Sequence, residues 1–193
     1  IIKKSKIKHK LKFSKKYLNI INVGRFTDQK DQITLLKAIN EIKNRINLKL
    51  YIIGRGIEKK NLEEYILQNK LEKIIKLIPF KKNPFNLIRS ADLFILSSIY
   101  EGLPNVLLEA LTLKKFVISS DCPTGPNEIL LNGKAGFLFK PQDYKKLAQL
   151  IIFYNKNQKK LSNKTNIGYK NLDRFDLKKN LEKYFQTIKK FLY

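Results

Sequence analysis

The sequence predicts an α/β fold in which a doubly wound, Rossmann-like parallel sheet carries helices on both faces. Two observations lead to this prediction. Short apolar runs alternate along the chain with longer segments whose apolar residues recur at helical spacing. The apolar runs are also nearly continuous, as expected for parallel strands that are buried on both faces and joined by helical crossovers.

Each strand is predicted from a short apolar run, most of which end at a glycine, a proline or a pair of serines. The runs are LNIINVG, LKLYIIG, KIIKLIP, DLFILSS, FVISS and GFLF, at 18–24, 48–54, 73–79, 92–98, 116–120 and 136–139. Their β-branched and aromatic residues favour extended backbone. Because a helix-forming segment follows each run, we expect the strands to lie parallel in one sheet.

The helices are predicted from apolar residues that are spaced three and four positions apart. They are expected at 31–45, 58–69, 84–91, 104–113, 142–157 and 177–192, with a turn or helix start at 125–132. Pro104 suits the first turn of its helix, where the missing N–H is no loss. A polar stretch rich in Asn and Lys separates the last two helices.

Length and composition suit one globular domain. The chain has 193 residues, 43% hydrophobic and 11% aromatic, which provides a buried core and excludes a wholly disordered chain. It has no initiator methionine, no signal peptide and no apolar run of about 18 residues, so we expect a fragment of a soluble protein. A single cysteine, Cys122, and a single histidine, His9, exclude an internal disulfide and a Cys/His zinc site, and a cytoplasmic setting fits.

The net charge of +24 raises the question of a nucleic-acid partner. Arginine favours base readout and bidentate phosphate contacts, yet it occurs only at 25, 45, 55, 89 and 174, and the lysines are spread along the whole chain. We therefore expect a solvated charge and no specific nucleic-acid contact. An anionic membrane surface is a partner that the same charge would suit.

Candidate ligand-binding residues stand where the strands end, because ligands of such sheets bind beyond the carboxyl ends of the strands. In YEGLPNVLLEAL, Glu101 and Glu109 lie eight positions apart around a helix start. Asn105, Glu109 and Thr112 share one stripe of that helix at about 100° per residue. Carboxylates that accept sugar hydroxyls, near a helix N-terminus that favours phosphate, suit a nucleotide-sugar. An ordinary solvent-facing stripe would have the same spacing.

Two cations follow the first strand. In GRFTDQK, Gly24 ends the strand, and Arg25 and Lys30 can reach the same crevice and neutralise a diphosphate without a metal. Ordinary surface charge is the alternative. No Walker loop is present, and GRG at 54–56 lacks the third glycine of a dinucleotide fingerprint. Cys122 is expected to be a small buried residue rather than a nucleophile.

Together these segments resemble the C-terminal domain of retaining GT-B glycosyltransferases of family 4, the glycosyl transferases group 1. The resemblance is carried, in order, by INVGRFTDQKD, LYIIGRGIEKKNLE, ADLFILSSIYEGLPNVLLEALTLKKFVISSDCPTGPNEIL and NGKAGFLFKPQD, roughly over 18–155. It implies the C-terminal half of a GT-B fold, with a nucleotide-sugar-binding domain at 18–158. Residues 1–17 would be a basic linker or the tail of a missing N-terminal domain. Residues 159–193 would be a polar stretch and a C-terminal helix that packs back toward that domain.

The resemblance also implies roles for the candidate residues. Arg25 and Lys30 would hold the donor diphosphate, and Glu101 would contact the transferred sugar, so these three are the predicted catalytic residues. Glu109 would bind the ribose of the nucleotide. The other predicted donor-binding residues, which flank the base or present backbone N–H groups, are Gly24, Pro79, Gly102, Leu103, Pro104 and Asn105. No metal and no cofactor are expected, because the cationic pair would stabilise the leaving group instead.

We therefore expect a glycosyltransferase that moves a hexose or an N-acetylhexosamine to a glycan or to a polyprenyl- or other lipid-linked acceptor. Glu-Gly-Leu-Pro replaces the usual Glu-Gly-Phe-Gly, a variant that resembles a branch using UDP-sugars in bacterial polysaccharide assembly. UDP is accordingly expected over GDP or ADP. The acceptor would be bound through the missing domain, so the chain alone would bind donor weakly and transfer nothing.

The expected setting is the cytoplasm, with peripheral contact at the inner face of an anionic membrane. Three alternatives fit parts of the same sequence. They are a non-catalytic nucleotide-sugar binder, a GT-B-fold epimerase and a basic nucleic-acid or membrane-surface binding module. The last alternative predicts binding that depends steeply on salt and is indifferent to Glu109.

Overall fold

The structure, a computed structural model, describes residues 1–9, 11 and 13–192. Its centre is a six-stranded sheet in which every pair of neighbours is parallel and the order is β3-β2-β1-β4-β5-β6. The strands are β1 (Leu18–Val23), β2 (Leu48–Gly54), β3 (Ile75–Pro79), β4 (Leu93–Leu96), β5 (Phe116–Ser120) and β6 (Phe137–Phe139). The predicted fold class, a doubly wound Rossmann-like sheet, is confirmed.

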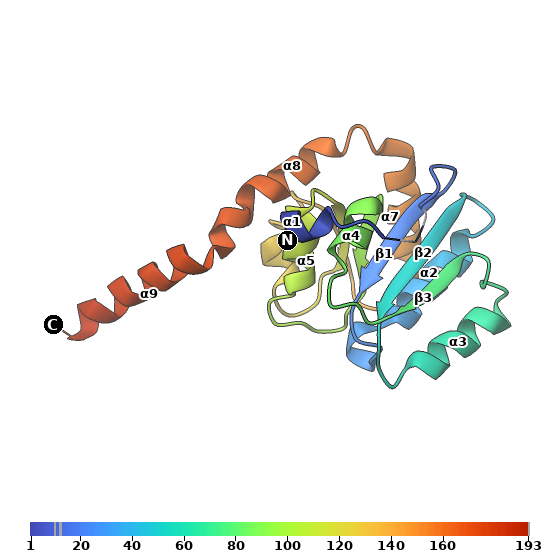
Figure 1. The fold of residues 1–193 in the computed structure, drawn as a ribbon, viewed down its shortest axis with the longest axis horizontal. Coiled ribbons are helices and arrows are strands. Elements are labelled where there is room, and N and C mark those ends of the chain that lie inside the picture. The colour runs from blue at the N-terminus through green and yellow to red at the C-terminus, as the bar shows by residue number, and fades with distance from the viewer. Residues whose placement is uncertain (10, 12, 193) are drawn as a thin grey trace.

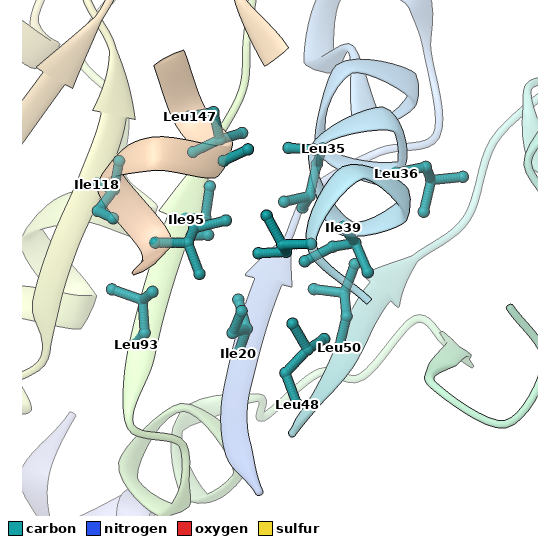
Figure 2. Close-up of a cluster of buried hydrophobic side chains, with 14 of the residues drawn as sticks. Ile20, Leu35, Leu36, Ile39, Leu48, Leu50, Leu93, Ile95, Ile118 and Leu147 are labelled. Atoms are coloured by element: carbon teal, nitrogen blue, oxygen red, sulfur yellow. The ribbon is translucent and has the colours of Figure 1, made fainter. Parts of the chain in front are cut away.

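One face of the sheet is covered by α2 (Gln32–Ile42), α3 (Lys59–Gln68) and α7 (Tyr144–Asn157). Figure 2 shows Leu35 and Ile39 of α2 and Leu147 of α7 beside strand residues such as Ile20 and Ile95, all of them buried. These apolar stripes are the ones that the helical spacing in the sequence predicts.

The opposite face is covered by α4 (Phe85–Ser90), α5 (Asn105–Thr112), α6 (Pro126–Ile129) and α8 (Ser162–Lys170). Successive residues of a strand supply the two cores, since side chains alternate along extended backbone. Ile20 belongs to the first core, and its neighbour Ile21 belongs to the second. Both cores are apolar, which explains why the strands are continuous apolar runs.

The region between α7 and the last helix differs from the sequence prediction. The stretch expected to be only polar contains α8 and a short 3-10 helix, η2 (Asn171–Phe175). Gly168 of α8 is buried, and a Cβ there would come within 2.7 Å of Leu111 Cδ2, so α8 packs closely on α5. Few apolar residues make this contact, among them Ile167 and Leu172. Because they are so few, the sequence shows no clear helical periodicity here.

The basic N-terminal segment packs on the domain in its described part. It contains a short helix, α1 (Ile2–Ser5), beside α4 (Figure 1). Asn83 Nδ2 and Asn86 Nδ2 donate hydrogen bonds to the backbone carbonyls of Lys4 and Ile7, both at 3.1 Å. The role of residues 1–17 as a link to a further domain stays a prediction.

The last helix, α9 (Leu177–Leu192), projects away from the rest of the molecule (Figure 1). Several of its large apolar side chains are exposed, namely Leu177, Leu181, Tyr184, Phe185 and Phe191. Within the part of the chain that the structure describes, no helix combines the length and the apolar character needed to cross a bilayer.

Candidate functional site

The sheet topology reverses direction at the carboxyl ends of β1 and β4. These two strands are neighbours, but the chain leaves β1 toward β2 on one side and leaves β4 toward β5 on the other. At such a reversal the loops diverge and leave room for a ligand. The loop after β1 carries Arg25 and Lys30, and the loop after β4 carries Glu101.

Lys30 and Glu101 meet between these two loops. Lys30 ends the short 3-10 helix η1 (Asp28–Lys30), and its Nζ lies 2.6 Å from Glu101 Oε1. The side chains are only 15% and 6% exposed. Ser98 Oγ donates a second hydrogen bond, also 2.6 Å long, to the same carboxylate oxygen. The pair is therefore partly desolvated. It differs in this from an exposed ion pair on the surface, which contributes little to stability.

The loop after β5 fixes the backbone of Glu101. Glu101 N donates to Pro123 O, and Thr124 N donates to Glu101 O, both at 2.7 Å. Gly125 has a φ of +89°, and a Cβ at this position would overlap Gly102 O. Glycine is thus required where the two loops touch. An open hollow lined by Asp121, Cys122, Thr124, Asn127, Glu128 and Arg174 adjoins this contact.

Arg25 lies beside the same cluster but is exposed. Its guanidinium donates to Gln29 Oε1 at 3.4 Å, and Gln29 Nε2 donates to the backbone carbonyl of Tyr100 at 3.0 Å. Gly24 adjoins Lys30, because a Cβ on Gly24 would touch the aliphatic part of the lysine at 3.5 Å. Both predicted cations therefore stand on one short loop, as the sequence suggested.

Glu109 sits one turn into α5, and it is half-buried. Burial raises the pKa of its carboxyl above the ordinary value. Pro104 is buried at the N-cap of α5, just before the helix begins at Asn105, whereas Gly102 and Leu103 are exposed. A half-buried carboxylate near a helix start is costly in isolation, a feature that is common at functional sites.

Pro79 ends β3, two strands away from β1, and pairs with Gly54 at the end of β2. The next residue, Phe80, is exposed, and the Arg55 guanidinium lies 5.1 Å from the centre of its ring. Gly54 and Gly56 allow close approach of the segment Gly24 to Phe26, because a Cβ on either glycine would overlap its backbone. Backbone packing thus explains the GRG turn without a dinucleotide fingerprint.

The structure brings some predicted residues together and leaves others apart. Gly24, Lys30 and Glu101 form one cluster, and Arg25 is joined to the loop after β4 through Gln29. Within residues 13–192, neither Glu109 nor Pro79 hydrogen-bonds to a side chain of that cluster. The sequence predicted no role for two residues that contact this cluster. Ser98 hydrogen-bonds to Glu101, and Gln29 joins the loops after β1 and β4.

Cys122 and His9 lie in surroundings that indicate no catalytic role. Cys122 is buried, as expected, and burial raises the pKa of its thiol. His9 Nε2 lies 2.9 Å from Ser90 Oγ, on the α4 side of the domain. Among the described residues, no three His, Cys, Asp or Glu side chains are grouped so that they could hold a metal ion. The metal independence of the site stays a prediction.

Comparison with known proteins decides the family. The family model described as Glycosyl transferases group 1 matches residues 3–171. The chain belongs to the group 1 glycosyltransferases. The matched range contains the sheet, the helices that pack on it and every predicted site residue.

Relatives of this group 1 chain come from archaea and bacteria. An uncharacterized glycosyltransferase of Methanocaldococcus jannaschii is 38% identical over 168 residues, covering 76% of this chain and 40% of the relative. A Campylobacter jejuni N-acetylgalactosamine-N,N'-diacetylbacillosaminyl-diphospho-undecaprenol 4-alpha-N-acetylgalactosaminyltransferase is 28% identical, covering 86% of this chain and 46% of the relative. The chain thus spans less than half the length of these two curated relatives.

Solved structures show the same fold. HepE of Anabaena, crystallised in complex with UDP, superimposes with a TM-score of 0.82 at 21% identity. The superposition covers 91% of this chain and 49% of HepE. The group 1 chain therefore has the fold of one half of a GT-B glycosyltransferase, in agreement with the sequence prediction.

Proposed function

We propose that this chain is the donor-binding domain of a retaining glycosyltransferase that moves a hexose or an N-acetylhexosamine from a UDP-sugar to a glycan or lipid-linked acceptor. The observation that carries the proposal is the Lys30–Glu101 pair, 2.6 Å apart at the carboxyl edge of the sheet and next to Arg25. Two cations and a carboxylate at one edge of the sheet provide partners for a diphosphate and for sugar hydroxyls.

Lys30 serves both Glu101 and the donor. Without donor, Glu101 neutralises the lysine ammonium, because a desolvated charge needs a counter-charge. When the donor binds, the diphosphate contacts Lys30 and Arg25 while Lys30 stays hydrogen-bonded to Glu101 Oε1, and the other carboxylate oxygen of Glu101 accepts hydroxyls of the transferred sugar. The negative charge that develops on the departing UDP is stabilised by the same two cations.

The remaining donor groups lie around this centre. Glu109 accepts hydrogen bonds from the ribose hydroxyls. In the loop from Gly102 to Asn105, the exposed residues Gly102, Leu103 and Asn105 offer backbone N–H groups to the sugar and phosphates. Pro79 and the adjacent Phe80 flank the base. UDP is preferred over GDP or ADP, a proposal supported by the UDP found in the HepE crystals.

The acceptor is held by protein outside this chain. The C. jejuni relative is named for transfer to a diphospho-undecaprenol-linked saccharide, which supports a lipid-linked or glycan acceptor here. The apolar face of α9, with Leu181 and Phe185 exposed, is covered by the same additional domain. The isolated chain therefore binds UDP weakly and transfers no sugar.

A specific observation favours peripheral membrane contact as an additional property. At about 100° per residue, Lys179, Lys183 and Lys190 of α9 lie on the side opposite its apolar stripe, and Lys178 and Lys189 flank the stripe. They remain free to attract anionic lipids when the apolar face is covered. Binding to vesicles that contain anionic lipid, but not to neutral vesicles, would be lost when the five lysines are replaced by glutamine.

Calorimetric titration of the chain with UDP, GDP and ADP tests the main proposal. The titrations are done at physiological salt, with a chelator present and without added metal. UDP should bind most tightly, and Glu109→Ala and Lys30→Gln should each weaken it by about tenfold or more. Matched controls are Glu63→Ala and Lys59→Gln, which remove an exposed pair on α3.

Other outcomes would identify the alternatives. Equal binding of the three nucleotides, unchanged by Glu109→Ala and steeply weakened by salt, indicates a basic binding surface and contradicts the proposal. Binding that depends on Glu109 in a longer protein that transfers no sugar indicates a non-catalytic nucleotide-sugar binder. Loss of binding on chelation, restored by a divalent cation, contradicts metal independence.

A further inference from the structure

Four serines are buried at the carboxyl ends of two neighbouring strands. Ser97 and Ser98 follow β4, and Ser119 and Ser120 end β5, and each has 0% exposed surface. A hydroxyl without access to water must find its hydrogen bonds inside the protein. The bonds of these serines therefore show what the strand ends hold in place.

Ser98 bonds directly to the charged pair. Its Oγ donates to Glu101 Oε1 at 2.6 Å, the oxygen that also accepts from Lys30 Nζ at 2.6 Å. One carboxylate oxygen thus accepts two short hydrogen bonds, one from the loop after β1 and one from the end of β4. Bonds to an ionised acceptor are short and strong, so they restrict the rotation of the Glu101 side chain.

The neighbouring serines fix the same assembly through the backbone. Ser120 Oγ donates to the backbone carbonyl of Ser98 at 2.6 Å, which ties Ser98 to β5. Ser97 Oγ donates to the backbone carbonyl of Lys30 at 3.0 Å. Two consecutive serines therefore hold both members of the pair: Ser98 the carboxylate of Glu101, and Ser97 the main chain of Lys30.

We propose that Ser98 is a positioning residue for donor binding. It orients the Glu101 carboxylate and, through the shared oxygen, the Lys30 ammonium toward the nucleoside diphosphate. Ser98 is fully buried, so it acts through Glu101 and does not touch the donor itself. This inference rests on the proposed function, because it needs the pair to lie at the donor site. Because the two side chains are already fixed, less side-chain conformational entropy is lost when the donor binds.

The test compares UDP affinity, measured by calorimetry, among serine variants of the full chain. Ser98→Ala should weaken UDP binding by about tenfold, because binding must then immobilise the freed Glu101 and Lys30 side chains. Ser98→Thr keeps the hydroxyl and should restore most of the affinity. The matched control is Ser119→Ala: Ser119 is equally buried, but its Oγ donates to the backbone carbonyl of Ser120 at 2.9 Å. This control should change the affinity by less than about twofold.

A second comparison separates positioning from a general structural role. In a Glu101→Ala background the carboxylate is gone, so Ser98→Ala should have no further effect on UDP affinity. A merely structural role predicts the same loss in both backgrounds. If Ser98→Ala fails to fold, Ser98→Cys keeps the volume with a weaker donor and should give an intermediate affinity.

Two kinds of failure are distinguishable. If the wild-type chain binds no UDP, the proposed function fails and this inference fails with it. If the wild type binds UDP and Ser98→Ala or Ser98→Cys binds it equally well, only the inference is overturned. It is also overturned if Ser119→Ala weakens binding as much as Ser98→Ala does, or if the Ser98 effect persists without Glu101.

Discussion

Lys30 Nζ lies 2.6 Å from Glu101 Oε1, although the two residues are 71 positions apart in the chain. With 15% and 6% of their side chains exposed, the two charges are largely removed from water and depend on each other. A partly buried ion pair at the carboxyl edge of a Rossmann-like sheet is expected where a charged ligand binds.

The pair should contribute measurably to stability. Lys30→Ala leaves the Glu101 carboxylate buried without its cation, so the free energy of unfolding should fall by about 1–3 kcal/mol. The double variant Lys30→Ala/Glu101→Ala should lose less than the sum of the two single variants, with a coupling of about 1 kcal/mol or more. Urea unfolding of the four proteins measures this coupling.

The exposed pair Lys59–Glu63 provides the control for that cycle. Its side chains are 58% and 53% exposed, so its coupling should be only about 0.3–0.5 kcal/mol. Equal coupling energies for the two pairs would show that burial does not strengthen the Lys30–Glu101 interaction.

Glu109 should reduce the stability of the domain at neutral pH. Burial raises the pKa of its carboxyl above 4.5, so the folded chain holds this proton more tightly than the unfolded chain. The free energy of unfolding therefore falls as the pH rises from 4.5 through the raised pKa and levels off above it. Glu109→Gln removes this titration and should raise the thermal midpoint at pH 7 while weakening UDP binding.

Thermal unfolding across acidic to neutral pH checks this prediction. The difference between Glu109→Gln and the wild type should grow with pH, whereas Glu63→Gln, at a side chain that is 53% exposed, should follow the wild type. A variant Glu109→Gln that is less stable than the wild type at pH 7 would show that the carboxylate has a stabilising partner.

Two glycines of the site should respond differently to alanine. Gly125→Ala places a Cβ at a φ of +89°, overlapping Gly102 O and 2.6 Å from Pro104 Cδ, so it should cost about 1–3 kcal/mol of stability. Gly102 has nothing within 4 Å of such a Cβ, so Gly102→Ala should change stability by less than about 0.5 kcal/mol.

The same pair separates folding from ligand contact. If the loop after Glu101 lies against the donor, Gly102→Ala should weaken UDP-sugar binding although the fold is intact. Denaturation and calorimetry of both variants measure the two effects. Wild-type affinity in a stable Gly102→Ala chain would remove Gly102 from the donor site.

The apolar stripe of α9 should matter for association and not for the stability of this domain. Leu181 and Phe185 are 46% and 59% exposed, so Leu181→Gln/Phe185→Gln should change the free energy of unfolding by less than about 0.5 kcal/mol. The same substitutions should reduce self-association in sedimentation velocity, since an exposed apolar stripe favours association. Lys183→Gln on the polar face is the control. A clear loss of stability would mean that α9 packs on the domain in solution.

Much of the fold is predictable because its signals are local. Strands such as Leu48–Gly54 and Phe116–Ser120 match the predicted ranges, since burial on both faces makes each an unbroken apolar run. Helix α5 begins within a residue of its predicted start, because Pro104 and the glycine before it mark the turn. In contrast, α8 has little apolar periodicity, and its position depends on Gly168 fitting against Leu111.

The sequence by itself determined the fold class, the family resemblance and the residue types at each strand end. Only the tertiary structure decided which of those residues meet. Lys30 faces Glu101 because β1 pairs with β4 as well as with β2. No local sequence pattern specifies the pairing of β1 with β4. The same long-range pairing of β4 with β5 brings Ser120 to Ser98 and so sets the carboxylate in place. Local propensity specifies elements, whereas the contacts of a site form between segments far apart in the chain and are fixed by how the elements pack.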